Sequence, residues 1–153
     1  MSLSESNPVA ASTSEAPSAD APRVRLVAVQ VRRSPSGQCR IEVVLDAPSG
    51  ERVSAVREGL SGEAADVRLG AEATVAALNS IGDGGLRFEL AGAKTVRAFD
   101  QLVVLVLVGV SGAGPARLLG VATNEGDMCR AATISVLNAT NRARSLATRP
   151  PSE

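Results

Sequence analysis

The sequence contains no histidine, tryptophan or tyrosine, and its only aromatic residues are Phe88 and Phe99. Histidine is the commonest general base and metal ligand in proteins, so its absence counts against the usual catalytic and metal sites. A single lysine, Lys94, accompanies the arginines, and 16 basic residues balance 16 acidic ones, for a net charge of zero. A neutral chain with almost no aromatic platforms is not expected to bind nucleic acid.

Cysteine is also scarce. Cys39 and Cys129 lie far apart in the chain and form neither a disulfide framework nor a zinc signature. Cys129 falls near an expected helix N-terminus, where the pKa of a thiol can decrease. Neither cysteine has a nearby base, so we interpret both as inert, buried residues. No motif for a cofactor or a metal is present, and the chain is predicted not to be an enzyme.

Long hydrophobic runs are missing. The longest, Leu102 to Val108, is far shorter than the ~20 residues that a membrane-spanning helix needs. Its β-branched composition instead predicts a strand covered on both faces. We therefore expect no membrane partner and, with two reduced thiols, a cytoplasmic location.

The two ends of the chain have the composition of disordered tails. Residues 1–22 contain six serines, five alanines and three prolines but no basic residue. A positive n-region and an apolar h-region are both lacking, so a secretory signal is not expected. Residues 147–153 include paired prolines, which cannot continue a helix. One folded domain is predicted over residues 23–146.

Within that domain, the pattern predicts three strands and a helix, and then the same order again. Strands are expected at 24–32, 39–46 and 51–59, followed by a helix over about 64–81 that ends at the glycines of 82–85. The second set comprises strands at 86–90, 99–110 and 116–123 and a helix over about 127–146. Asn124 is the expected helix cap, and Asp127 suits the positive end of the helix dipole.

The two predicted helices share a sequence. Residues 73–79 read ATVAALN and residues 132–138 read ATISVLN, 59 positions apart, and Gly59 and Gly120 stand in corresponding third strands. The repeat predicts an α+β fold of two tandem βββα units, about 23–82 and 86–146, related by a pseudo-two-fold axis. The recurrent Leu-Asn pair suggests a shared role for Asn79 and Asn138 at the helix ends.

Three short strands and one helix cannot cover both faces of a sheet. The apolar run at 102–108 needs more cover than one unit provides. We therefore expect the fold to be completed by a homodimer.

The closing segment GVATNEGDMCRAATISVLNATNR, from Gly120 to Arg142, resembles the end of the C-terminal regulatory domain of the 2-isopropylmalate synthase and homocitrate synthase family. The shared features are a glycine-rich strand end, an aspartate that opens the helix, small residues on its first turns and a terminal Asn-Arg. The chain has no catalytic barrel, and its first-half loop lacks the family's proline. The resemblance implies a dimeric, amino-acid-sensing fold and adds Ala131 to the candidate ligand-binding residues.

Two loops are candidate binding sites because each precedes a helix N-terminus, where backbone N–H groups favour a carboxylate. The first contains Gly59, Ser61, Gly62 and Asp66. Its alternative interpretation is an ordinary strand-to-helix turn whose acidic residues already occupy the positive helix end.

The second loop contains Thr123, Asn124 and Asp127, where Asp127 favours an ammonium group and ordinary helix capping is again the alternative. Together the loops would form an amino-acid pocket across the dimer. The sequence thus predicts a non-catalytic, dimeric module that senses a small amino acid or carboxylate. The alternative is a structural or protein-interaction dimer without a pocket, whose N-terminal tail binds a protein partner.

Overall fold

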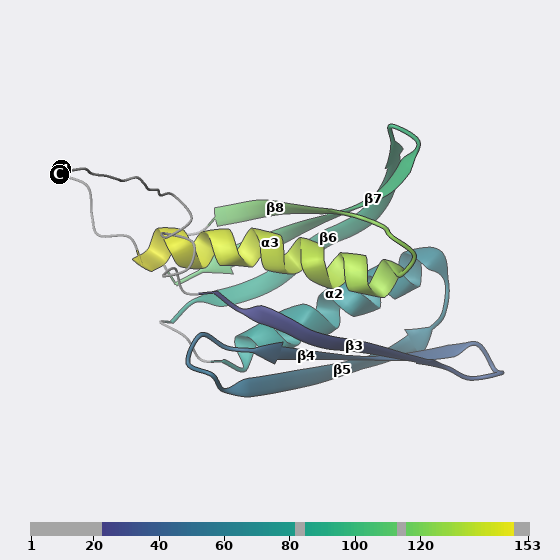
Figure 1. Cartoon of the computed structure of the whole chain (residues 1–153), viewed down its shortest axis with the longest axis horizontal. Helices are drawn as coiled ribbons and strands as arrows, with labels where there is room; N and C mark the ends of the chain where they lie inside the picture. The colour runs from purple at the N-terminus through teal and green to yellow at the C-terminus, as the bar shows by residue number, and fades with distance from the viewer. Residues whose placement is uncertain (1–22, 82–84, 113–115, 149–153) are drawn as a thin grey trace, which may run out of the picture.

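The computed structural model describes residues 23–81, 85–112 and 116–148, in which a βββα order occurs twice (Figure 1). The expected tail at 1–22, residues 149–153 and parts of two glycine-containing loops lie outside these residues. The first unit comprises β3 (Arg25–Arg33), β4 (Gln38–Asp46), β5 (Arg52–Leu60) and α2 (Glu63–Asn79). The second comprises β6 (Arg87–Ala98), β7 (Gln101–Ser111), β8 (Ala116–Thr123) and α3 (Met128–Thr148). The predicted α+β fold with an internal repeat is confirmed.

The first sheet is antiparallel, with the strand order β3-β4-β5. Its two turns contain Gly37 and Gly50 at φ of 90° and 94°, a backbone region that side chains disfavour. Alternate residues of β4 point into the core, so that Ile41, Val43 and Leu45 are fully buried, as the period-two pattern predicts.

The second sheet has the order β6-β7-β8, and here the strand boundaries differ from the prediction. The first strand does not end near Leu90 but continues to Ala98, which pairs with Gln101. The strand expected from Phe99 is wrong at its start. Phe99 and Asp100 form a two-residue turn with φ of 52° and 63°, the left-handed geometry that matches the twist of a hairpin.

Among the residues that the structure describes, the apolar run in β7 is covered on one face only. Val104, Val106 and Val108 are buried, whereas the alternate residues Leu105 and Leu107 are only half-buried. The prediction of cover on both faces therefore holds for the inner face alone.

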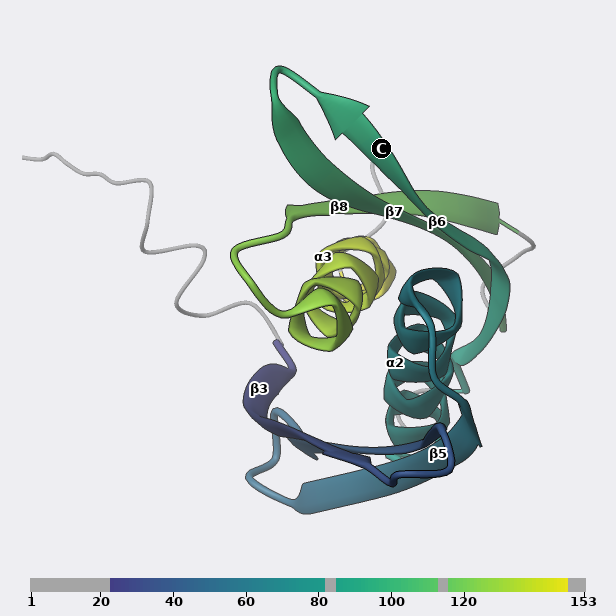
Figure 2. The same cartoon turned by 90° about the vertical axis from the view of Figure 1, so that its right-hand side faces the viewer.

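The two helices lie side by side between the two sheets (Figure 2). Helix α2 packs on β4 and β5 of its own unit and also on β6 of the second unit. Helix α3 packs on β7 and β8, and reaches across to β3 of the first unit. Each helix therefore belongs to both halves of the core.

The two units share details of strand register and helix packing. Each first strand has a register shift at the same place, between Leu26 and Ala28 in β3 and between Leu90 and Gly92 in β6. Where the repeated helices meet, the buried hydroxyls of Thr74 and Thr133 lie 3.0 Å apart in a hydrogen bond. Val43 and Val106 hold equivalent positions in the two central strands. Ala55 pairs with Val43 and Gly120 pairs with Val106, so Gly120 corresponds to Ala55 and not, as expected, to Gly59.

Asparagine side chains attach each helix to the beginning of the other unit. Asn79 donates from Nδ2 to the Phe88 carbonyl (2.8 Å) and accepts from the Phe88 N–H (2.9 Å). Asn141 makes the same two bonds with Val24, at 3.2 and 3.0 Å. The expected counterpart of Asn79, Asn138, instead donates to the Val121 carbonyl of its own unit. The shared role exists, but it lies one helical turn later in α3.

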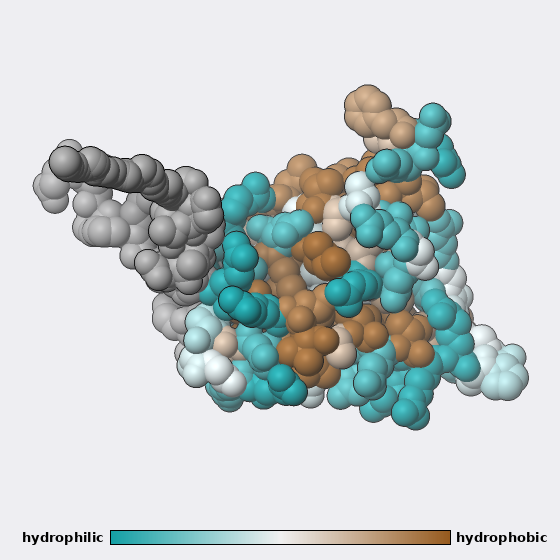
Figure 3. Space-filling model, viewed as in Figure 1, coloured by the Kyte–Doolittle hydropathy of each residue, from teal (hydrophilic) through white to brown (hydrophobic). Residues whose placement is uncertain are grey.

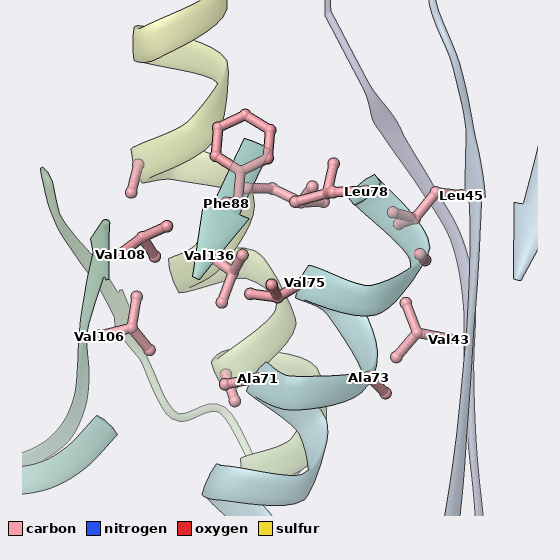
Figure 4. Close-up of a cluster of buried hydrophobic side chains, with 14 of the residues drawn as sticks. Val43, Leu45, Ala71, Ala73, Val75, Leu78, Phe88, Val106, Val108 and Val136 are labelled. Atoms are coloured by element: carbon pink, nitrogen blue, oxygen red, sulfur yellow. The ribbon is translucent and has the colours of Figure 1, made fainter. Parts of the chain in front are cut away.

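The core is built from valine, leucine, isoleucine and alanine, with inward residues of both sheets meeting the helices (Figure 4). Phe88 is its only aromatic among the described residues, and the guanidinium of the buried Arg144 lies 5.5 Å from the centre of its ring. This distance is within the range of a cation–π interaction.

In the part of the chain that the structure describes, no helix is long and apolar enough to cross a membrane. Among the same residues, no group of three or more histidine, cysteine, aspartate or glutamate side chains is placed to hold a metal ion.

Candidate functional site

The first candidate loop is closed by its own side chains. Asp66 lies in the first turn of α2 and is only 7% exposed. One carboxylate oxygen, Oδ2, accepts from Arg33 at 2.6 Å. The other, Oδ1, accepts from the hydroxyl of Ser61 and the N–H of Gly62, each at 3.3 Å. These bonds occupy both carboxylate oxygens, so the geometry favours the strand-to-helix turn over a ligand site.

The electrostatics of Asp66 follow from these contacts. Burial raises the pKa of its carboxyl, but the hydrogen bond from Arg33 and those from Gly62 and Ser61 more than offset it, and the net pKa lies below its ordinary value. The hydrogen bond and charge of Asp66 in turn raise the pKa of Arg33. The carboxylate is therefore ionised and paired at neutral pH.

Gly59, near the end of β5, packs against the helix that follows. A side chain added at Gly59 would first meet Leu69 of α2, at 3.4 Å. The glycine thus allows close contact between β5 and the helix that follows it.

The second candidate loop caps α3. The Oδ1 atom of Asp127 accepts from the N–H groups of Cys129 (3.0 Å) and Arg130 (3.2 Å), which makes Asp127 the helix cap. The expectation that Asn124 caps the helix is wrong. Asn124 instead accepts from the N–H of Gly126, at 3.0 Å, and forms a local turn before the helix begins.

The first turns of the two helices meet within one chain. The thiol of Cys129, in the first turn of α3, donates to the Asp66 carbonyl at 3.7 Å, and a side chain at Gly70 would lie 3.0 Å from the Cys129 carbonyl. The N-termini of α2 and α3 therefore lie at the same end of the molecule (Figure 1).

Both thiols are buried, as expected. The pKa of Cys129 rises to about 12 because it is buried beside the carboxylates of Asp66 and Asp127, which outweighs the helix N-terminus. Burial also raises the pKa of Cys39. Neither thiol is a nucleophile at neutral pH.

A hollow of about 370 Å³ lies between the end of β8 and the first turns of α3. Three of the predicted site residues line it, namely Thr123, Asp127 and Ala131. Asn124 does not line it, and neither do the predicted residues of the first loop, Gly59, Ser61, Gly62 and Asp66. The hollow thus includes part of the second candidate loop and none of the predicted residues of the first.

Sequence reasoning missed other residues of this hollow. They are Ala122, Glu125, Arg130, Ile134 and Asn138. The spacing of Asp127, Arg130, Ile134 and Asn138, three or four residues apart, places them on one face of a helix, and this signal was present in the sequence.

The hollow combines opposite charges with an apolar floor. In the described part of the chain, the Arg130 guanidinium has no carboxylate partner and the Oδ2 atom of Asp127 accepts no hydrogen bond. Ala131 and Ile134 supply apolar surface beside them. Such an arrangement can bind a small zwitterion with an aliphatic side chain.

Comparison with protein-family models finds no match to this chain, and no curated protein matches it.

Proposed function

We propose that this protein is a non-catalytic, dimeric sensing module that binds a small amino acid or a small carboxylate in the hollow beside α3. The observation that carries the proposal is that Arg130 and Asp127 line the same hollow beside the apolar residues Ala131 and Ile134. A volume of about 370 Å³ is at the small end of ligand pockets, which span roughly 300–1,000 Å³. The resemblance of residues 120–142 to the synthase regulatory domain is part of the support for this proposal.

In the proposed complex, Arg130 and the Thr123 hydroxyl bind the ligand's carboxylate. The free carboxylate oxygen of Asp127, with Glu125 nearby, binds the ammonium group. Ala131 and Ile134 contact the ligand's aliphatic portion. Binding shifts the dimer only if the ligand has different affinities for two arrangements of the copies.

A non-catalytic role is supported by the state of the reactive groups. Asp66 is already paired with Arg33, and the pKa of Cys129 is too high for a nucleophile at neutral pH. The free thiols also support a cytoplasmic location, which is part of the proposal.

Calorimetric titration with a panel of aliphatic amino acids and their 2-oxo acid analogues tests the ligand. We expect saturable binding of at least one amino acid, weakened by about tenfold or more in Asp127→Asn, since a charged hydrogen bond contributes about 1.5–3 kcal/mol. Asparagine caps a helix as well as aspartate does, so this variant keeps α3 intact and removes only the charge. An analogue without an ammonium group should bind both proteins equally.

Two further variants separate the carboxylate contact from a general loss of charge. Arg130→Gln should abolish binding of both ligand types, whereas Arg68→Gln, which removes an exposed arginine from α2, should leave it unchanged. Absence of saturable binding across the panel at millimolar concentrations would exclude the sensing function.

The second candidate function is a structural or protein-interaction dimer that has lost its pocket. The specific observation that favours it is the first loop, where Arg33, Ser61 and Gly62 occupy the carboxylate of Asp66. A partner bound through residues 1–22 would belong to this alternative. Dimerisation without ligand binding would support it.

A further inference from the structure

The outer face of the second sheet carries a group of apolar side chains. Strands β6, β7 and β8 point one set of side chains at the helices and the alternate set outward. Leu119 and Val121 of the outward set are 51% and 44% exposed. We call the outward apolar set the apolar band; it consists of Val96, Val103, Leu105, Leu107, Leu119 and Val121.

The related face of the first sheet is charged. Its outward residues form ion pairs across the strands, Arg40 with Glu58 at 3.2 Å and Arg52 with Asp46 at 2.9 Å. The two units, which share one fold, therefore differ in their outer faces. The face of the first unit is charged, and the face of the second carries the apolar band. Since the fold does not require an apolar band, the band indicates a covered surface.

One end of the apolar band carries a projecting knob. The turn between β6 and β7 presents Phe99, which is 98% exposed and held in left-handed backbone geometry. The hairpin tip rises on the side of the sheet that faces away from the helices (Figures 1 and 2). In the space-filling view its apolar surface stands clear of the body (Figure 3).

The other end of the band carries a hollow of about 780 Å³. Gly109 lies on the outer face of β7 here and has no side chain to fill the space, and Arg87, Glu89, Ser111 and Arg117 surround it. Knob and hollow thus lie at opposite ends of one face.

We propose that two copies of this chain pair through their apolar bands, with the strands antiparallel and Phe99 of each copy seated in the hollow of the other. This arrangement has a two-fold axis that runs between the two sheets, perpendicular to the strands, and passes over β7 near Leu105 and Leu107. It also brings Lys94 of one copy toward Glu89 of the second copy. The inference depends on the dimeric part of the proposed function and not on ligand binding.

The available area is sufficient for a stable dimer. Three strands spaced about 4.8 Å apart and about ten residues long present roughly 500 Å² of sheet face. Burial of an aromatic side chain adds about 200 Å² on each copy. The total for two copies is about 1,400 Å², within the range of specific interfaces, whereas the sheet faces alone would fall short of it. The hairpin tip therefore decides whether the pair is stable.

Sedimentation equilibrium of the full chain tests the surface. Wild type should be a dimer at micromolar concentration. Leu107→Lys places a charge in the centre of the apolar band and should raise the dissociation constant at least about 100-fold. The matched control is Val44→Lys, because Val44 holds the same position on the charged outer face of the first sheet. The control should remain dimeric.

The knob is tested by Phe99→Ser, which should raise the dissociation constant at least about tenfold. Leu60→Ser is its control, since Leu60 is also a large exposed side chain, at 67%, but lies at the end of β5. Both positions are at the surface, so both variants should keep the wild-type circular dichroism spectrum.

The register is tested by charge exchange. Lys94→Glu or Glu89→Lys alone should weaken the dimer by several-fold, and the double variant should restore it. A monomeric wild type would overturn this inference together with the dimeric part of the proposed function. A dimer that persists unchanged in Leu107→Lys and Phe99→Ser would overturn this inference alone and indicate another face.

Discussion

At the residue scale, the first loop shows how a candidate site can be a structural contact. Glycines, a serine and an aspartate before a helix are typical of anion sites and of helix starts alike. The decisive partner, Arg33, stands 33 positions earlier in the chain and reaches Asp66 only because β3 ends beside α2. No local pattern contains that contact.

The Arg33–Asp66 pair predicts a pH-dependent stability. Because the folded-state pKa of Asp66 lies below its unfolded value of about 3.9, its contribution is present at neutral pH and is lost as the pH falls through the folded-state pKa. We expect Asp66→Asn to lose about 1–3 kcal/mol of unfolding free energy at pH 7.

Urea unfolding at pH 7 and pH 3 measures this loss. The difference between wild type and Asp66→Asn should narrow at the lower pH, because pH 3 lies below the unfolded-state pKa of about 3.9 and protonation of the unfolded carboxyl there favours unfolding of the wild type. Asp46→Asn, which breaks an exposed pair with Arg52, should cost less at pH 7. An equal cost at both pH values would contradict the ionised pair.

Gly120 predicts a second residue-scale effect. A methyl group added there would lie 1.9 Å from the Ser135 carbonyl of α3, a distance that no packing tolerates. Gly120→Ala should therefore move α3 off its sheet and cost about 3 kcal/mol or more. Gly59→Ala is the control, since its methyl group would meet the flexible Leu69 side chain at 3.4 Å. Thermal denaturation should separate the two variants clearly.

At the element scale, periodicity and turn residues predicted both units, but the hairpin between β6 and β7 was misplaced. Its turn contains Phe99 and Asp100 and no glycine, asparagine or proline. An aromatic residue favours a strand, so the pattern indicated a strand start where the chain reverses. The fold imposes left-handed geometry that local preference does not specify.

The helix ends show the same limit of prediction from local sequence at the candidate site. Three residues of the hollow, Thr123, Asp127 and Ala131, could be identified from the sequence. Asn124 was assigned the cap because any asparagine or aspartate before a helix qualifies, and only the backbone geometry assigns it to Asp127. Likewise, Asn141 and not Asn138 performs the role of Asn79, because contact with the opposite unit selects the position.

At the scale of the whole molecule, the duplicated units have kept their interior and changed their surfaces. The shared interior includes the Thr74–Thr133 contact and the matching register shifts. The outer faces differ, one charged and one apolar, and so do the two loops, one closed and one open. The two units thus share one scaffold but carry different surfaces. Only the surfaces of the second unit are proposed to bind a ligand or a second copy of the chain.

Shared helices predict that the two units unfold together. Helix α2 contacts β6 of the second unit and α3 contacts β3 of the first, so unfolding of either unit removes a helix contact from the first strand of the other. At one fixed protein concentration, circular dichroism should report a single thermal transition. Asp66→Asn in the first unit and Gly120→Ala in the second should both lower that same transition. Backbone amides of β4 and β7 should then exchange hydrogen with equal free energies in wild type. Two separate transitions, or β4 protection that persists in Gly120→Ala after β7 has lost its own, would show that the units are independent.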